Sequence, residues 1–311
     1  MTVANTSGTR GCSRAWLEII RAPNLLTVPG DPLAGFCLAR GDAGAGAIAA
    51  VAISLLAYAG GMIMNDVFDR SIDANERPAR PLPSGRISIT AAITAMLVLT
   101  GSALLIAWGM GTATGITASI LVTAILLYNA GLKNIPFVGA LAMGTCRALS
   151  LLVGSACATA RLLPAGDTIY FALLIMAYIA SVTTIARREM GTAPIPVMHR
   201  YLPGTILLAG LSFYSLTMGP SNIIPHGVAG EAAFSTISCV AVAMCFVLGA
   251  RLAPGTNIPI QKVIGGFIGV MLLVQAAMCT GPTYAAGFIA AGILIVAYPL
   301  FGMGARRVAS S

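Results

Sequence analysis

The chain has 311 residues, of which 57% are hydrophobic and only 9% are charged, and its mean hydropathy is +0.88. Soluble domains carry about 25% charged residues, so this composition excludes an ordinary soluble protein. The net charge is +8, but no basic run alternates with stacking aromatic residues, so we expect no nucleic-acid partner. No polar stretch is long enough for a second domain, and we expect residues 1–311 to form a single membrane-embedded domain.

Ten apolar segments follow one another along the chain, each near the ~20 residues that cross a ~30 Å hydrocarbon core. They lie at residues 24–40, 45–64, 88–108, 113–130, 137–157, 168–186, 203–219, 231–250, 263–280 and 284–301. Pro29, Gly30, Asp31 and Pro32 interrupt the first of them. The sequence therefore predicts an all-α, polytopic transmembrane bundle of about ten helices.

The basic residues indicate which way the chain is inserted. With residues 1–20 as a polar cytoplasmic tail, 15 of the 18 Lys and Arg residues fall on the cytoplasmic side, where membrane proteins concentrate them. Arg40 and Arg161 fall outside, and Arg147 lies within a segment. We therefore expect an integral multi-pass protein with a cytoplasmic N-terminus, in contact with membrane lipids, in the cytoplasmic membrane of a bacterium.

A cluster of oxygen ligands ends the second apolar segment. Counted from Asp66, the first, fourth and eighth positions share one helical face, so Asp66, Asp69 and Asp73 converge beside Asn65 where a membrane helix meets water. Mg²⁺ prefers carboxylate oxygens and commonly bridges to a substrate phosphate, so this cluster predicts a magnesium site. The alternative is a solvated helix end whose acids pair with the nearby arginines.

The stretch after these carboxylates is rich in arginine and proline. Arg77 and Arg80 can fork onto phosphate oxygens, and the run 80–85, with two prolines and a glycine, is forced into a turned path back toward the membrane. The segment 65–86 is therefore predicted to form a diphosphate-binding loop. For any one arginine, the alternative is a purely topological role.

Residues 65–73, Arg77 and the run 80–85 together resemble the first signature of the UbiA superfamily of intramembrane prenyltransferases. The resemblance implies a fold of nine helices, or ten with the segment at 284–301, around a central cavity, with Mg²⁺ holding an isoprenoid diphosphate near the cytoplasmic face. It implies that Asn65, Asp66 and Asp69 bind the metal and that Asp66 and Asp69 are catalytic. Asp73 would contribute a ligand or support one.

The sequence departs from that family in a later loop. Where members carry a second aspartate-rich motif, residues 181–191 retain one acid, Glu189, preceded by Arg187 and Arg188. In the loop 187–200, the two guanidiniums could bind pyrophosphate directly, and Glu189 could ligate the remaining ion, so we predict all three as catalytic. The alternative is lost or altered chemistry.

Other polar residues are predicted to contact the substrate. Tyr128 and Lys133 lie in the loop after the fourth apolar segment, where members of the family often carry a Tyr and a Lys. The alternative is that the two residues anchor the chain at the membrane interface. A charged guanidinium in the middle of an apolar segment, such as that of Arg147, costs free energy unless it faces a wet cavity or a counter-charge. We therefore expect its partner to be an anionic ligand or Asp31. Asn24, on the broken first segment, is predicted to line the same cavity.

The sequence as a whole favours a Mg²⁺-dependent transferase that moves a prenyl group from an isoprenoid diphosphate to an aromatic, small or lipid-like acceptor. Its apolar cavity would shield the allylic cation from water. The alternative is a non-catalytic carrier that holds a prenyl lipid or quinone in the same cavity. A CDP-alcohol phosphotransferase is excluded because its tighter Asp-Gly-x-x-Ala-Arg pattern is absent.

Overall fold

The structure, a computed structural model, describes residues 6–39, 41, 44–188, 194–218, 228–256, 258–280 and 285–309. Within these ranges the regular structure is entirely helical. The elements are α1 (Thr6–Ile19), η1 (Ala22–Thr27), α2 (Gly30–Leu38), α3 (Ala45–Phe68), α4 (Arg70–Glu76), α5 (Ile89–Met110), α6 (Thr112–Ala130), η2 (Leu132–Asn134), α7 (Val138–Thr159), α8 (Gly166–Ala186), α9 (Val197–Phe213), η3 (Tyr214–Met218), α11 (Val228–Ala250), α12 (Ile260–Thr280) and α13 (Ala285–Ala309). The all-α prediction is confirmed.

Each of the ten predicted segments contains a helix, and seven helices among the described residues are long and apolar enough to cross a membrane. The first segment differs from the prediction. It forms the short turn η1 and then α2, whose nine residues extend only about 14 Å and do not span a bilayer. The break falls at Pro29, which precedes α2, because proline suits the start of a helix and not its interior.

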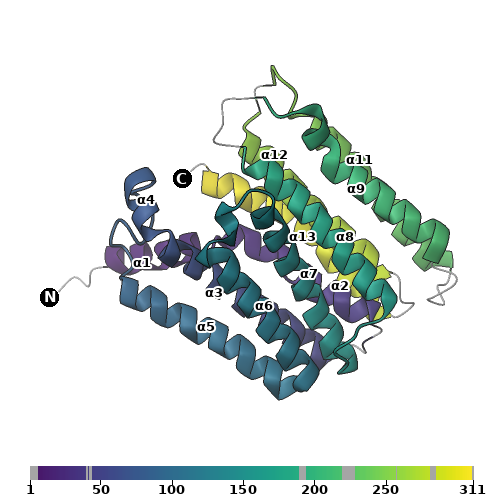
Figure 1. The fold of residues 1–311 in the computed structure, drawn as a ribbon, viewed down its shortest axis with the longest axis horizontal. Helices are drawn as coiled ribbons and strands as arrows, with labels where there is room; N and C mark the ends of the chain where they lie inside the picture. The colour runs from purple at the N-terminus through teal and green to yellow at the C-terminus, as the bar shows by residue number, and fades with distance from the viewer. Residues whose placement is uncertain are drawn as a thin grey trace.

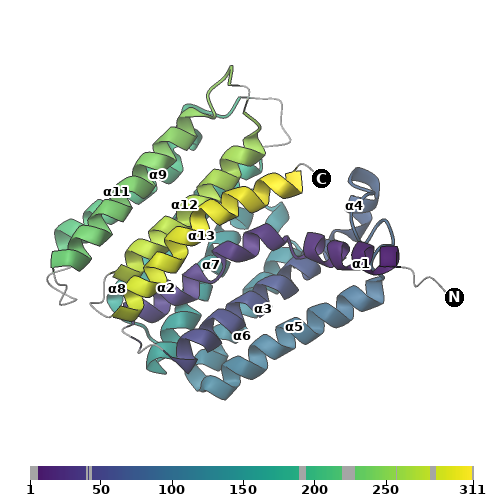
Figure 2. The ribbon, with the colours of Figure 1, turned by 180° about the vertical axis from the view of Figure 1, so that it is seen from behind.

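The helices lie side by side in one bundle (Figures 1 and 2). The long helix α5 forms one edge, the pair α9 and α11 forms the opposite edge, and α3, α6 and α7 lie between them. Helix α12 is the most enclosed of the candidate spans, with 83% of its apolar window buried. The core therefore lies around α12, where α2, α8, α11 and α13 pack against it.

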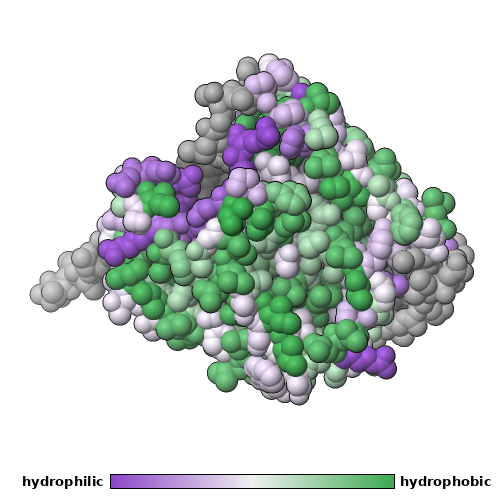
Figure 3. All heavy atoms as spheres, in the orientation of Figure 1, coloured by the Kyte–Doolittle hydropathy of each residue, from purple (hydrophilic) through white to green (hydrophobic). Residues whose placement is uncertain are grey.

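One end of the bundle carries most of the polar surface described here. Hydrophilic side chains gather over α4 and the segment after it, above a face that is largely apolar (Figure 3). Helix α1 fastens this segment, because Ile19 packs with Leu82 and Ile87. Two hydrogen bonds of 2.8 and 3.1 Å also join the Arg86 guanidinium to the Glu18 carboxylate. We call this end, where α3 ends and α7 begins, the carboxylate end.

Candidate active site

The Asn-Asp motif lies where α3 passes into α4. The amide of Asp69 donates to the Asn65 carbonyl at 3.0 Å, and the amide of Asp73 donates to the Asp69 carbonyl at 2.8 Å. These four-residue steps keep a helical register through the boundary at Asp69, so the side chains of the motif stay on neighbouring positions of one face. The local backbone thus places Asp66, Asp69 and Asp73 on one helical face, as the spacing predicts.

Two cations pair with these carboxylates. Arg80 Nη1 lies 2.5 Å from Asp73 Oδ2 and 3.7 Å from Asp66 Oδ1. Lys133 Nζ, which comes from the turn after α6, lies 2.6 Å from Asp69 Oδ1 and 3.2 Å from Asn65 Oδ1. Arg80 and Lys133, both predicted to bind substrate, therefore lie at the predicted metal ligands and balance their charge.

The donor set of the motif fits Mg²⁺. Its atoms are carboxylate and amide oxygens, the ligands that this hard cation prefers. In the part of the chain that the structure describes, no three acidic, histidine or cysteine side chains are close enough to hold an ion together. In this structure Asp66 and Asp73 pair with Arg80, whereas Asp69 pairs with Lys133.

A tight turn brings Arg80 back over the motif. The Ile87 amide donates to the Pro81 carbonyl at 3.1 Å, and Gly85 adopts a left-handed conformation, with φ of 73°, that suits glycine. Buried Leu82 anchors the turn against α1. The Arg77 side chain is exposed at the same end and has no ion-pair partner among the described residues.

The second predicted loop reaches the same end of the bundle. The Arg187 guanidinium donates to the backbone carbonyls of Lys133, Asn134 and Ile135 at 2.8, 3.3 and 3.2 Å. It therefore holds the turn that carries Lys133. Arg188 is exposed, whereas Glu189 lies outside the described residues.

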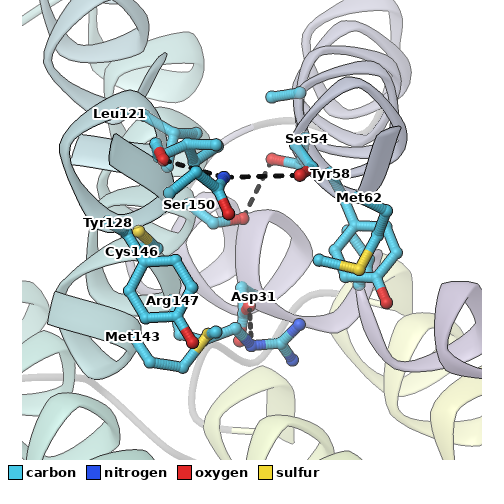
Figure 4. Close-up of a pocket in the computed structure, with 15 residues that line it drawn as sticks. Asp31, Ser54, Tyr58, Met62, Leu121, Tyr128, Met143, Cys146, Arg147 and Ser150 are labelled. Carbon is cyan, nitrogen blue, oxygen red and sulfur yellow. Dashed lines mark hydrogen bonds and ion pairs between the residues drawn. The ribbon is translucent and has the colours of Figure 1, made fainter. Parts of the chain in front are cut away.

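A mainly apolar cavity with about 570 Å³ of empty space, part of it open, lies among α2, α3, α6 and α7. Figure 4 shows Tyr58 and Met62 on one side and Tyr128, Met143 and Cys146 on the other. Met62 lies one helical turn before Asp66 on α3. The cavity thus begins within about one helical turn of the motif and continues into the bundle, and the predicted Tyr128 and Arg147 line it.

Arg147 has the counter-charge that the sequence suggested. Its Nε lies 2.8 Å from Asp31 Oδ2, and its Nη2 donates to the Thr27 carbonyl at 2.9 Å. Gln275 Nε2, from α12, donates to Asp31 Oδ1 at 2.6 Å. We call Asp31, Arg147 and Gln275 the buried polar cluster, because Asp31 and Gln275 are fully buried and Arg147 is mostly buried.

The sequence alone predicts no role for two residues of this region, Arg21 and Gln275. Arg21 adopts a left-handed backbone conformation, with φ of 50°, which costs a non-glycine residue about 1 kcal/mol. The positive charge of Arg21 acts on Asp66, Tyr58 and Tyr128. Tyr58 in turn contacts Asn24, which is not among the cavity-lining residues. The sequence marks these two residues only weakly: Gln275 is a polar residue within an apolar segment, and Arg21 lies two residues before Pro23.

The sequence model of the UbiA prenyltransferase family matches residues 32–257. The match covers well over half of the chain and includes the carboxylate motif, the cavity-lining parts of α3, α6 and α7, and Arg147. The chain belongs to the UbiA prenyltransferase family. The resemblance seen in the sequence is therefore confirmed, and Gln275 lies outside the matched region.

Two relatives bear the name digeranylgeranylglyceryl phosphate synthase. The Ignicoccus hospitalis protein is 36% identical over 145 residues, which are 47% of this chain and 48% of that protein. The Methanothrix thermoacetophila protein is 31% identical over 189 residues, which are 58% of this chain and 68% of that protein. The chain thus spans about half the length of the first relative.

Solved structures share the fold of this UbiA-family protein. A UbiA homologue from Archaeoglobus fulgidus, bound to GPP and Mg²⁺, has a TM-score of 0.64 and 14% identity, with 87% of this chain and all of that chain covered (100%). A structure of digeranylgeranylglyceryl phosphate synthase has a TM-score of 0.62 and 18% identity, with 86% and 97% covered. At these identities the likeness shows the fold alone.

Proposed function

We propose that this UbiA-family protein transfers a prenyl group from an isoprenoid diphosphate to an acceptor within the membrane. The C1–O bond of the donor breaks, and its electron pair leaves on diphosphate. The acceptor then bonds to C1 and releases a proton. The observation that carries the proposal is the position of the Asn-Asp motif, one helical turn above an apolar cavity on the same helix, α3.

Asn65, Asp66, Asp69 and Asp73 would hold Mg²⁺. When bound, the ion supplies positive charge that stabilises the departing diphosphate. Arg80 and Lys133 pair with the carboxylates in this structure, and with those oxygens engaged by the ion both cations would be free to donate to phosphate oxygens. Arg77, exposed at the same end, adds a further guanidinium. These residues thereby bind and orient the donor head group.

The lower part of the site keeps water from the allylic cation. Met62, Met143 and Ile125 give the cavity an apolar wall, which excludes the competing water nucleophile. Tyr128 and Arg147 supply the polar positions on that wall, and Asn24 contacts the wall residue Tyr58. We propose that these groups orient the substrates inside the cavity.

The second loop has two different roles in this proposal. Arg187 positions Lys133 through the three carbonyls that it holds. Arg188, exposed beside it, stabilises the departing diphosphate in place of the missing aspartates, and Glu189 supplies the one carboxylate of that loop.

We further propose a lipid-like acceptor that carries a phosphate. The relatives named digeranylgeranylglyceryl phosphate synthase support this choice over an aromatic ring. The excess of cations at the carboxylate end also suits a second anionic group beside the diphosphate.

We place the carboxylate end in the cytoplasm, because most basic residues lie at that end of the sequence topology. An impermeant thiol reagent should label Ser84→Cys from the cytoplasmic side and Leu163→Cys from the other side. Labelling of both from one side would contradict this orientation. A bacterial membrane stays a prediction, because the relatives described above are archaeal.

The decisive experiment gives the purified protein Mg²⁺ and labelled isoprenoid diphosphates, with either prenylated glyceryl phosphate or an aromatic acid as acceptor. We expect release of pyrophosphate together with a labelled lipid product from the glyceryl phosphate. Product from the aromatic acid alone would overturn the acceptor proposal. Saturable donor binding without pyrophosphate release, with any acceptor, would show a carrier instead of an enzyme.

A further inference from the structure

The inner end of the cavity is formed by two serines that face each other. Ser54 on α3 and Ser150 on α7 both line the cavity and are both buried. Their hydroxyl oxygens are 3.0 Å apart and hydrogen-bonded, as Figure 4 shows. This bond bridges the two helices that enclose the cavity.

The protein is closely packed behind these serines. A Cβ atom added at Gly154 would lie 1.9 Å from the Pro32 carbonyl oxygen, and one added at Gly35 would lie 1.9 Å from the Leu151 carbonyl oxygen. Helices α2 and α7 therefore touch through their backbones just beyond Ser150. Val153 is fully buried on the same stretch of α7. A chain that enters from the carboxylate end consequently meets a closed wall at this depth.

The distance to this wall defines a length for the donor. Ser54 lies twelve residues before Asp66 (66 − 54 = 12) in the same helix, which is about 18 Å along its axis. An extended isoprene unit adds four backbone bonds, or about 5 Å at ordinary C–C bond lengths. Between the carboxylates and the serines there is therefore room for up to about four units.

We propose that Ser54 and Ser150 form the floor of the donor cavity and set an upper limit of about four isoprene units on the prenyl chain. This inference rests on the proposed function, because it assumes that the diphosphate binds at the Asn-Asp motif. The Ser150 hydroxyl donates to the Ser54 hydroxyl oxygen, so each of the two floor oxygens has a hydrogen-bond partner where the end of an apolar chain would lie. Large side chains at either position fill the cavity from its inner end.

The test compares prenyl diphosphates of two, three, four, six and eight units by both affinity and kcat/KM. In the wild type, we expect affinity and kcat/KM to stay similar for donors of two to four isoprene units and to fall about tenfold or more for donors of six and eight units. Ser54→Phe should lower the values for four units about tenfold and leave two units within about twofold. Ser150→Leu, on the opposite helix, should act in the same direction and serves if Ser54→Phe does not fold.

Ile48→Phe is the matched control, because Ile48 lies on the same helix with 72% of its surface exposed and does not line the cavity. It should leave the length profile unchanged. Equal use of four and eight units by the wild type would overturn the floor, as would an unchanged profile in both serine variants. A profile that appears in affinity without any turnover would support the floor and contradict the proposed transfer, so the two failures are distinguishable.

Discussion

The carboxylate end and the buried polar cluster both pair acids with cations, but their surroundings differ. At the carboxylate end the Asp69 side chain is 22% exposed and its partner Lys133 12%, whereas Asp31 in the buried cluster is 0% exposed. The first set comes mainly from one short stretch, residues 65–80. The second joins α2, α7 and α12. A pair near water can exchange its partner for a ligand, whereas a fully buried pair is held in place by the cost of leaving a charge unpaired.

The largest expected effect on stability is at the buried cluster. Arg147→Met leaves the Asp31 carboxylate buried without its cation, and removal of one partner from such a pair costs about 3–5 kcal/mol. Thermal unfolding in detergent should therefore show a large loss of stability. The double variant Asp31→Leu with Arg147→Met should recover most of it, because no unpaired charge remains.

The matched change at the carboxylate end sharpens the comparison. Lys133→Met should cost about 1 kcal/mol or less, because water can hydrate the partly exposed Asp69. Donor affinity should nevertheless fall in this variant. If Arg147→Met and Lys133→Met destabilised the protein equally, the contrast between the two regions would be wrong.

The next effect concerns the two neighbouring arginines of the second loop. Arg188→Ala should lower turnover by about 10²-fold, the size expected when one preorganised donor to developing charge is lost, and change donor affinity much less. Arg187→Ala should weaken donor binding as well, because it releases the carbonyls around Lys133. Steady-state kinetics together with equilibrium donor binding separate these effects. A change in affinity alone for Arg188→Ala would favour a carrier.

The carboxylate end could be predicted because its determinants are local. A four-residue helical register and a proline-rich turn bring Asp66, Asp73 and Arg80 together within the stretch 66–80. The apolar segments were equally visible, because each carries its own length and composition. The first was misjudged, since the sequence does not state how far α2 continues after Pro29, and the segments that form α9 and α13 are also not among the seven helices long and apolar enough to cross a membrane in the described chain.

The buried contacts could not be predicted in full, because they depend on which helices pack together. Asp31 was a candidate partner of Arg147, but no local pattern connects either of them to Gln275, which is 244 residues from Asp31. The Ser54–Ser150 bond is similarly remote, and two serines in apolar helices resemble many others. The left-handed Arg21 was also invisible, because its conformation is unusual for arginine.

The central claim is that the carboxylates of α3 hold the Mg²⁺ that binds the donor. The most direct test titrates Mg²⁺ against binding of an isoprenoid diphosphate in the wild type, Asp66→Ala and Asp69→Ala, with the unfolding temperature of each as the control for folding. We expect both variants to lose Mg²⁺-dependent binding at an unchanged unfolding temperature, because a metal ligand is removed from a cluster that is partly self-repelling. Binding with the wild-type dependence on Mg²⁺ in both variants would contradict the claim.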